Sequence, residues 1–359
     1  MFKKLLVLLV VVASVFALSA CKKERTYAAD GVYTAFSADL TSKSGPQLTS
    51  VSVTIENDEV KSFFIDCKQS YVTAYVLGDN PETTEVVETD FPTTTPKTFA
   101  FNAESKKELG LKYGMHNAND TTNSYTKQDL TTQAGRDAYQ AYLTASGKKE
   151  WFQQANLLEA YFLANDPATI TVDATSKAIN NVAGVTIKDG GYSALATEAL
   201  ALAKEGKVQV VKATGANIVW VTAQVTEDGE FESILIDTLQ GKVTAGKFAW
   251  NEKSKQELGY LYGMHNADNT AASYTKQVLT TEAGLNAYKA YLTASGKKEW
   301  FEQVKLLSDY VLANGWDGKI VALTTGKLDT AASAAALASV SVTVAEYAEL
   351  LEELCDIFE

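Results

Sequence analysis

The sequence predicts an α+β protein made of two tandem copies of one domain, each a small antiparallel sheet with packed helices. A long internal repeat is the first observation: residues 141–152 read AYLTASGKKEWF, and residues 290–301 read the same. Strand-like segments joined by a short turn open each copy, and amphipathic helical segments follow them. The repeat period is much longer than a solenoid unit, so it indicates a duplicated domain.

The repeat extends well beyond that block. Three segments (108–110, 113–118 and 124–128) return at the same offset as 257–259, 262–267 and 273–277. We place copy 1 at residues 30–205 and copy 2 at residues 206–359. Copy 1 has an extra Thr- and Pro-rich stretch between Asp66 and Phe99, which predicts a loop insertion.

Strands are expected first in each copy. Residues 31–36 alternate polar and apolar side chains, which is typical of a half-buried strand. Residues 51–55 and 60–65 predict a β-hairpin around Asn57 and Asp58. Asp228-Gly229 marks the corresponding turn of copy 2 and is the stronger turn signal.

Helices are expected next. Residues 106–113 and 135–145 have helical patterns that end near glycines. The clearest helix is predicted over 148–164, where one apolar face is formed by Trp151, Ala155, Leu158 and Phe162.

The end of copy 1 reads as two short β runs and a helix. The β runs are expected at 170–172 and 182–187. A last amphipathic helix is indicated by Tyr192, Leu195, Ala199 and Leu202.

Composition excludes several functions. The chain has 359 residues, 46% hydrophobic and 21% charged, with a formal net charge of −12. An acidic chain without a basic cluster argues against nucleic-acid binding. With three Cys, two distant His and no Cys-x-x-Cys, neither a structural zinc site nor a disulfide framework is expected.

The N-terminus predicts export and lipidation. Lys3 and Lys4 precede an unbroken apolar run at 5–17, and Leu18-Ser19-Ala20-Cys21 follows. The run is too short for a comfortable membrane span and ends in small residues, as signal peptides do. The ending resembles a bacterial lipobox. That resemblance implies removal of residues 1–20, a diacylglyceryl group on Cys21, a polar tether over 21–29 and attachment to the outer face of the cell membrane. The alternative is an uncleaved anchor helix.

The other cysteines leave two alternatives open. Cys67 and Cys355 are far apart in the sequence. They are expected to be two buried thiols, or else a disulfide that crosses the whole chain.

A glycine-rich turn before the last helix is the candidate site. Copy 1 has Gly184 and Thr186, then Gly190-Gly191 leading into the helix at Tyr192. Glycines let the backbone approach a phosphate, and a helix N-terminus offers free N–H groups. A Thr hydroxyl placed there is a candidate for esterification, and the alternative is a plain connection.

The chain resembles FMN-binding domains. Asp30-Gly31-Val32-Tyr33 is similar to the opening of those domains. The block that runs from 108–115 to 150–155, with ELG, YGM and EWF, resembles tandem FMN-binding lipoproteins of Gram-positive bacteria that act in extracellular electron transfer. The resemblance covers nearly the whole mature chain. It implies FMN as cofactor, an FMN transferase as partner, and a membrane quinone or NADH dehydrogenase as electron donor.

The family's attachment motif places the acceptor hydroxyls. Thr186 falls on the acceptor position of copy 1 with Gly184 at the motif's glycine. Ser341 falls on that of copy 2, and Thr343 is a nearby alternative. The leading Asp of the motif is Asn180 in copy 1 and Ala335 in copy 2.

Four aromatic residues are assigned either to the cofactor or to the core. Tyr192 and Tyr347 open the last helix of each copy, so they are expected nearest the phosphate and are carried as cofactor-binding candidates. Trp151 and Trp300 are expected in the core. His116 and His265 follow Gly-Met at a helix end, where a cation complements the dipole.

The expected function is therefore that of a lipid-anchored extracytoplasmic flavoprotein. It is expected to carry electrons rather than catalyse a reaction of its own. The alternative is a lipid-anchored binding protein of the same fold that has lost its flavin. No sequence feature supports a hydrolase.

Overall fold

The computed structural model describes residues 25–41, 45–74, 98–244 and 247–358. Each repeat contains a four-stranded antiparallel sheet whose strands lie in chain order. The first sheet holds β1 (Gly31–Leu40), β2 (Pro46–Glu56), β3 (Glu59–Ala74) and β4 (Thr98–Phe101). The second holds β5 (Lys207–Thr214), β6 (Asn217–Val225), β7 (Phe231–Thr244) and β8 (Lys247–Trp250). The predicted α+β class with two antiparallel sheets is confirmed.

Tight turns set the register of the long hairpins. Asn57 and Asp58 have φ of 56° and 60°, the left-handed pair that a two-residue turn between twisted strands requires. In copy 2 the turn is longer, and the Gly229 N–H donates to Thr226 O at 3.0 Å. Both hairpins carry a register shift next to the turn, at Thr54/Ile55 and Gln224/Val225.

The helices follow the same order in both repeats. Copy 1 has α2 (Lys106–Leu109), α3 (Gln133–Ser146), α4 (Trp151–Ala164) and α5 (Tyr192–Glu205). Copy 2 has α6 (Lys255–Leu258), α7 (Glu282–Ser295), α8 (Trp300–Asn314) and α9 (Ala345–Asp356). Short 3-10 turns extend α2 as η2 (Gly110–Tyr113) and α6 as η5 (Gly259–Tyr262).

The structure shifts the start of α4. A helix was expected from residue 148, but α4 begins at Trp151 because Glu150 is its N-cap in extended conformation. The Glu150 carboxylate accepts from the helix while the Gln153 side chain accepts from the Glu150 N–H, which makes a capping box. The apolar face predicted for this helix is buried as expected, with Trp151 and Leu158 in the core.

Two expected β runs are not strands. Residues 170–172 contribute one isolated bridge, Val172 with Ile179, and the bridge nearest to 182–187 pairs Ala178 with Lys188 just beyond that run. The N–H groups of Thr186 and Ile187 go to a side chain of α4 instead of a strand ladder. This stretch is therefore an irregular connection tied to α4.

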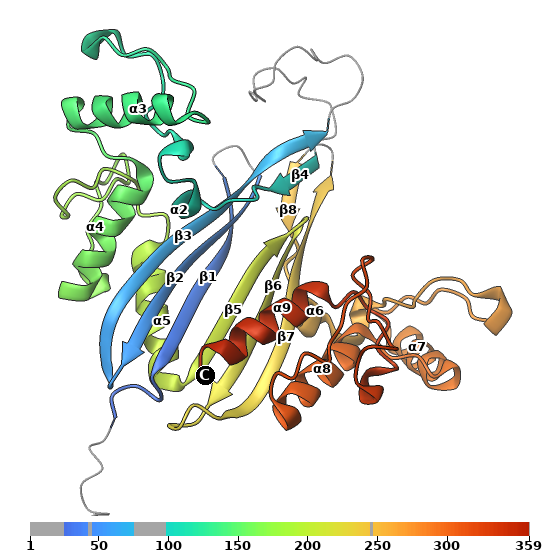
Figure 1. The fold of residues 1–359 in the computed structure, drawn as a ribbon. Helices are drawn as coiled ribbons and strands as arrows, with labels where there is room; N and C mark the ends of the chain where they lie inside the picture. Colours follow the sequence, from blue (N-terminus) through green and yellow to red (C-terminus); the bar gives the residue numbers. More distant parts are fainter. Residues whose placement is uncertain (1–24, 42–44, 75–97, 245–246, 359) are drawn as a thin grey trace, which may run out of the picture.

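Two long helices pack on each sheet, and of these α4 contacts β3 and α8 contacts β7. α5 packs on β1 and β2, and α9 packs on β5 and β6 (Figure 1). Buried and partly exposed side chains alternate along β2: Val51, Val53 and Ile55 are fully buried while the residues between them are not. One face of the strand is therefore available to pack against a helix. The remaining helices lie at opposite sides of the molecule, with α3 and α7 farthest from the sheets (Figure 1).

The two sheets also touch each other. Phe36 of β1 meets Trp220 of β6 at 5.4 Å between ring centroids. Phe99 meets Phe248 edge to face at 6.0 Å. Gly206 alone separates α5 from β5, and one hydrophobic core runs through both repeats. The repeats are thus packed into a single body.

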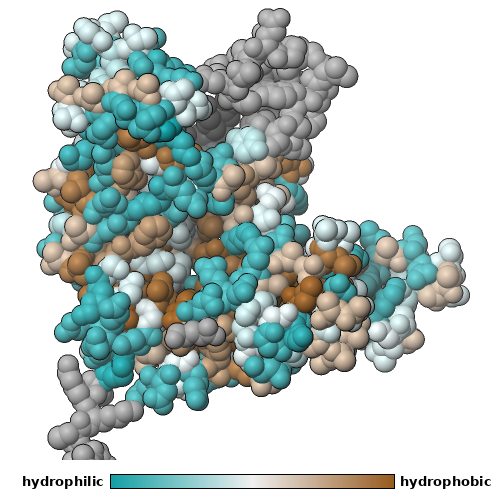
Figure 2. Space-filling model, viewed as in Figure 1, coloured by the Kyte–Doolittle hydropathy of each residue, from teal (hydrophilic) through white to brown (hydrophobic). Residues whose placement is uncertain are grey.

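The surface gives little sign of an apolar face on the side shown. Figure 2 shows hydrophilic residues over most of it, with hydrophobic residues interspersed. Among the described residues, none of the helices has the length and apolar character that crossing a membrane requires.

Candidate functional site

The N-terminal turn of α4 is the point where the candidate residues of copy 1 meet. Glu150 is fully buried, and its carboxylate accepts from the N–H groups of Trp151 (2.7 Å) and Met115 (3.0 Å). It also accepts from the Tyr139 hydroxyl at 2.5 Å. A buried carboxylate needs this many donors to offset lost hydration. Glu150 thereby fixes the turn at Gly114–Met115 and α3 to the start of α4.

Gln154 connects this turn to the predicted acceptor. Its Oε1 accepts from Thr186 N (2.7 Å), Thr186 Oγ1 (3.2 Å) and Ile187 N (3.1 Å). Its Nε2 donates to Lys149 O at 2.8 Å. The side chain is 1% exposed, whereas Thr186 is exposed. One buried amide therefore holds Thr186 at the surface.

Copy 2 repeats this arrangement with a different hydroxyl. Gln303 Oε1 accepts from Ser341 N (2.6 Å), Ser341 Oγ (3.1 Å) and Val342 N (3.2 Å). Gln303 Nε2 donates to Lys298 O at 2.8 Å. Ser341 is exposed like Thr186. The two predicted acceptors are thus structurally equivalent, although copy 2 has six more residues between the last repeat match and Ser341.

Gly184 lies in a turn two residues before Thr186. Its φ is 79°, a left-handed conformation that favours glycine. A Cβ here would lie 3.0 Å from Lys149 Cε, so the turn also packs closely on the lysine stem. The corresponding Ser339 of copy 2 is exposed.

Tyr192 and Tyr347 are buried at the start of α5 and α9. The Trp151 indole donates to Tyr192 Oη at 3.3 Å, and the Trp300 indole donates to Tyr347 Oη at 3.3 Å. Burial raises the pKa of both phenols. Both tryptophans are buried too, as expected. These four rings form matching edge-to-face pairs in the core.

The N-terminus of α5 already has an acidic partner. The Asp189 carboxylate accepts from Ser193 N at 3.3 Å and from the Ser193 hydroxyl. A phosphate at this helix end would meet that negative charge. Copy 2 has Val344 in place of Asp189, so the start of α9 lacks this carboxylate.

A lysine between two aromatic rings was missed by sequence reasoning. Lys106 Nζ lies 5.1 Å from the Tyr113 ring and 5.3 Å from the Trp151 ring. Lys255 lies at 4.9 Å from Tyr262 and 5.0 Å from Trp300. Burial lowers the pKa of Lys255 to about 8. The signal was present: each lysine directly follows a helix-capping Ser, Ser105 or Ser254.

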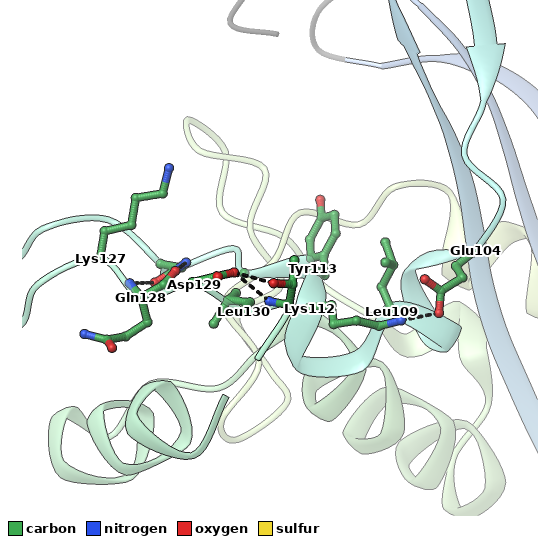
Figure 3. A pocket seen from close by; sticks show the side chains of 11 residues that line it. Glu104, Leu109, Lys112, Tyr113, Lys127, Gln128, Asp129 and Leu130 are labelled. Carbon is green, nitrogen blue, oxygen red and sulfur yellow. Dashed lines mark hydrogen bonds and ion pairs between the residues drawn. The ribbon is translucent and has the colours of Figure 1, made fainter. Parts of the chain in front are cut away.

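A hollow of about 840 Å³ lies beside η2 in copy 1. Its lining mixes charged and polar residues with Leu109, Tyr113 and Leu130. Lys112 is paired to Glu104 at its edge, and Lys127 extends away (Figure 3). Copy 2 has Leu261 and Val278 where copy 1 has Lys112 and Asp129, and both are exposed. The repeats therefore do not share these two charged lining residues.

The histidines and the two cysteines Cys67 and Cys355 lie in the described part of the chain. His116 and His265 are half-buried. The backbone N–H of each donates to a tyrosine hydroxyl, Tyr139 for His116 and Tyr288 for His265. Cys67 and Cys355 are buried on β3 and α9 and form no disulfide. Within the described part of the chain, His, Cys, Asp and Glu side chains do not gather in threes at any point able to hold a metal ion.

Several expectations lie outside the described residues. These are the signal peptide 1–20, Cys21 with the first part of the tether, and the Thr- and Pro-rich insertion at 92–96. The last part of the tether is described and is held to the sheet: Thr26 N and Tyr27 N donate to Asp58 Oδ1 at 2.8 and 2.9 Å.

Comparison with known proteins adds no assignment. No family model and no curated protein matches the chain. A solution NMR structure of a Clostridium thermocellum protein is 18% identical and covers 48% of this chain and 89% of that chain. Its TM-score is 0.23, which is too low to support an inference about fold or function.

Proposed function

We propose that this chain is a lipid-anchored extracytoplasmic flavoprotein that carries one FMN on each repeat, esterified to Thr186 and Ser341. A lipid on Cys21 anchors it to the outer face of the cell membrane. A membrane quinone or NADH dehydrogenase supplies the electrons, and the flavin supplies the redox chemistry when bound.

One observation supports this proposal most directly. Thr186 and Ser341 differ in residue type and in most of their flanking sequence, yet both residues are exposed and held by the same three bonds to a buried glutamine. A hydroxyl at the surface of a fixed turn is what a transferase needs to reach. The residues present therefore fit covalent attachment.

The attachment step can be written on this turn. Thr186 Oγ1 would hold the FMN phosphate as an ester. The transferase reaction would take FMN from FAD, with AMP as the leaving group and the hydroxyl proton passing to solvent. The hydrogen bond from Oγ1 to Gln154 is lost, while the bonds from Thr186 N and Ile187 N remain. The turn thus keeps its anchor to α4 after modification.

The test is co-expression of the full chain with its FMN transferase, followed by a denaturing gel under ultraviolet light and peptide mass mapping. Thr186→Ala and Ser341→Ala are each expected to remove one FMN mass, and the double variant is expected to be dark. Thr343→Ala is the matched control because Thr343 is an exposed hydroxyl two residues from Ser341. An adduct on Thr343, or none on any residue, contradicts the assignment.

A second function is favoured by the charge at α5. Asp189 occupies the helix end, and Asn180, which replaces the leading Asp of the motif, is bonded to Thr171 Oγ1 at 2.5 Å. These features support a lipid-anchored binding protein of this fold without flavin. A folded wild-type chain that stays dark with an active transferase would favour this alternative.

A further inference from the structure

An apolar groove of about 430 Å³ lies between the end of α4, α5 and β3 of copy 1. Its apolar lining residues are Val60, Phe63, Phe162, Leu163, Pro167, Leu200 and Ala201, with Tyr27 from the N-terminal segment. Leu163 at the edge of the groove is 49% exposed. The polar lining residues are Asn165, Asp166, Thr197 and Lys204.

Copy 2 covers the equivalent place with its own side chains. Trp316 stands where copy 1 has Pro167, and its indole donates to Glu352 on α9 at 3.1 Å. Phe358 packs edge to face on Phe231, the counterpart of Val60, at 5.7 Å. Copy 1 has the smaller Pro167 and Val60 at these two positions, which leaves the groove between its helices open.

The N-terminal segment is held against this groove. Thr26 and Tyr27 are bonded to Asp58, and Ala28 N donates to Ala203 O on α5 at 3.0 Å. Tyr27 lines the groove, and Cys21 precedes it by six residues. Six residues span at most about 20 Å, so a group on Cys21 reaches the groove without any rearrangement of the described chain.

We propose that this groove accommodates one acyl chain of the lipid on Cys21. The inference rests on the lipid anchoring in the proposed function and adds a binding site for the anchor. The acyl chain is apolar along its length, as the floor of the groove is. It enters the groove from the N-terminal segment of the protein, which the structure holds beside the groove. Occupancy competes with insertion into the bilayer, so the groove shelters the chain when the protein is away from the membrane.

The experiment uses the mature full-length protein from cells fed a diazirine fatty acid. After detergent removal and irradiation, cross-linked peptides are mapped by mass. Cross-links are expected on the peptides that contain Phe162–Leu163 and Leu200. Leu163→Asp is expected to reduce the yield of these cross-links about ten-fold. The substitution removes roughly half of the apolar contact that a leucine makes and places a carboxylate against the acyl chain.

Leu312→Asp is the matched control. Leu312 is the copy 2 counterpart of Leu163 and is 39% exposed, so the same charge is added without touching the groove. Its cross-link yield is expected to stay at the wild-type value. Ala201→Trp, which fills the groove from α5, is expected to reduce the yield as Leu163→Asp does.

The outcomes separate this inference from the proposed function. An intact mass without lipid on Cys21 overturns both the groove assignment and the anchoring. A lipidated protein whose cross-links fall equally on the two repeats, or persist in Leu163→Asp and Ala201→Trp, overturns the groove assignment alone. The FMN test on Thr186 and Ser341 is independent of both.

Discussion

Tyr139 donates its phenolic hydrogen to the carboxylate of Glu150 across 2.5 Å, and both side chains are fully buried. The same hydroxyl accepts from His116 N at 3.0 Å. Burial and the bond to Glu150 raise the pKa of Tyr139. Copy 2 repeats the pair with Tyr288 and Glu299. The pair joins α3, the Gly-Met turn and α4, so it positions the element that carries Gln154.

Removing the hydroxyl of this pair should destabilise the whole protein. Tyr139→Phe leaves a buried carboxylate with one donor fewer, and bonds to charged groups contribute about 2 kcal/mol. Urea unfolding is expected to show a loss of that size. Tyr71→Phe is the control because Tyr71 is exposed on β3. A loss below about 0.5 kcal/mol in Tyr139→Phe would show that the pair is dispensable.

Gln154→Ala should detach the acceptor turn. The two backbone donors of Thr186 and Ile187 lose their acceptor, and the expected loss in the free energy of unfolding is about 3 kcal/mol. Gln303→Ala is expected to cost the same through Ser341 and Val342. Limited proteolysis is expected to cut the 170–190 stretch in Gln154→Ala first. Cleavage at wild-type rate would mean that the turn is held by other contacts.

Stability should fall at high pH through Cys67. Burial raises the pKa of this thiol from 9.0 to about 11. The neutral thiol is favoured in the folded state, so its contribution is complete below pH 9 and is lost as the pH rises toward 11. The difference between wild type and Cys67→Thr isolates this titration, since Thr238 fills the equivalent position of copy 2. Parallel stability curves for the two proteins from pH 8 to 11 would contradict it.

Lys255 should titrate near pH 8. Burial lowers its pKa from 10.5 to about 8, with Asp237 and Glu299 acting against the shift. The charged form is disfavoured in the folded state, so this group's effect on stability becomes more favourable as the pH rises from 8 to 10.5. NMR of the methylated protein measures the pKa, and Lys255→Met identifies the signal. A titration midpoint above pH 10 would mean that the Lys255 ammonium stays well solvated between the Tyr262 and Trp300 rings.

Gly135→Ala should disrupt the start of α3. A Cβ at Gly135 would lie 1.9 Å from Asp129 O, a backbone atom that cannot move alone, so we expect a loss above about 2 kcal/mol. Gly147→Ala is the comparison: its Cβ meets nothing within 4 Å, and only φ of 67° is unfavourable, which costs about 1 kcal/mol. Equal melting temperatures for the two variants would refute the steric account.

The sequence predicted the elements whose signals are local. The hairpin turn at Asn57-Asp58 and the helix-ending glycines Gly114 and Gly147 lie where they were expected. The β runs predicted at 170–172 and 182–187 were wrong. Gln154 takes the N–H groups of Thr186 and Ile187, and Asn181 takes that of Thr171, so side chains replace strand partners. Such a partner leaves no trace in local periodicity.

The candidate site was predictable only in outline. The repeat indicated that Thr186 and Ser341 correspond, but not that a glutamine on α4 or α8 holds them. Lys106, which lies between two aromatic rings, was missed because a lysine near the start of a helix is usually solvent-exposed. Only its packing on Tyr113 and Trp151 shows otherwise. Whether Thr186, Ser341, Tyr192 and Tyr347 contact a flavin stays a prediction.

The contact between the two sheets has a consequence for the single repeat. Phe99 and Phe248 occupy corresponding positions and touch each other, and the corresponding Leu48 and Ile218 lie in one hydrophobic cluster. A contact in which a surface meets its own counterpart is the geometry of a two-fold homodimer. One repeat expressed alone would therefore carry a self-complementary face and pair with another copy in a concentration-dependent way. Gene fusion makes that pairing intramolecular, so the full chain keeps it at any dilution.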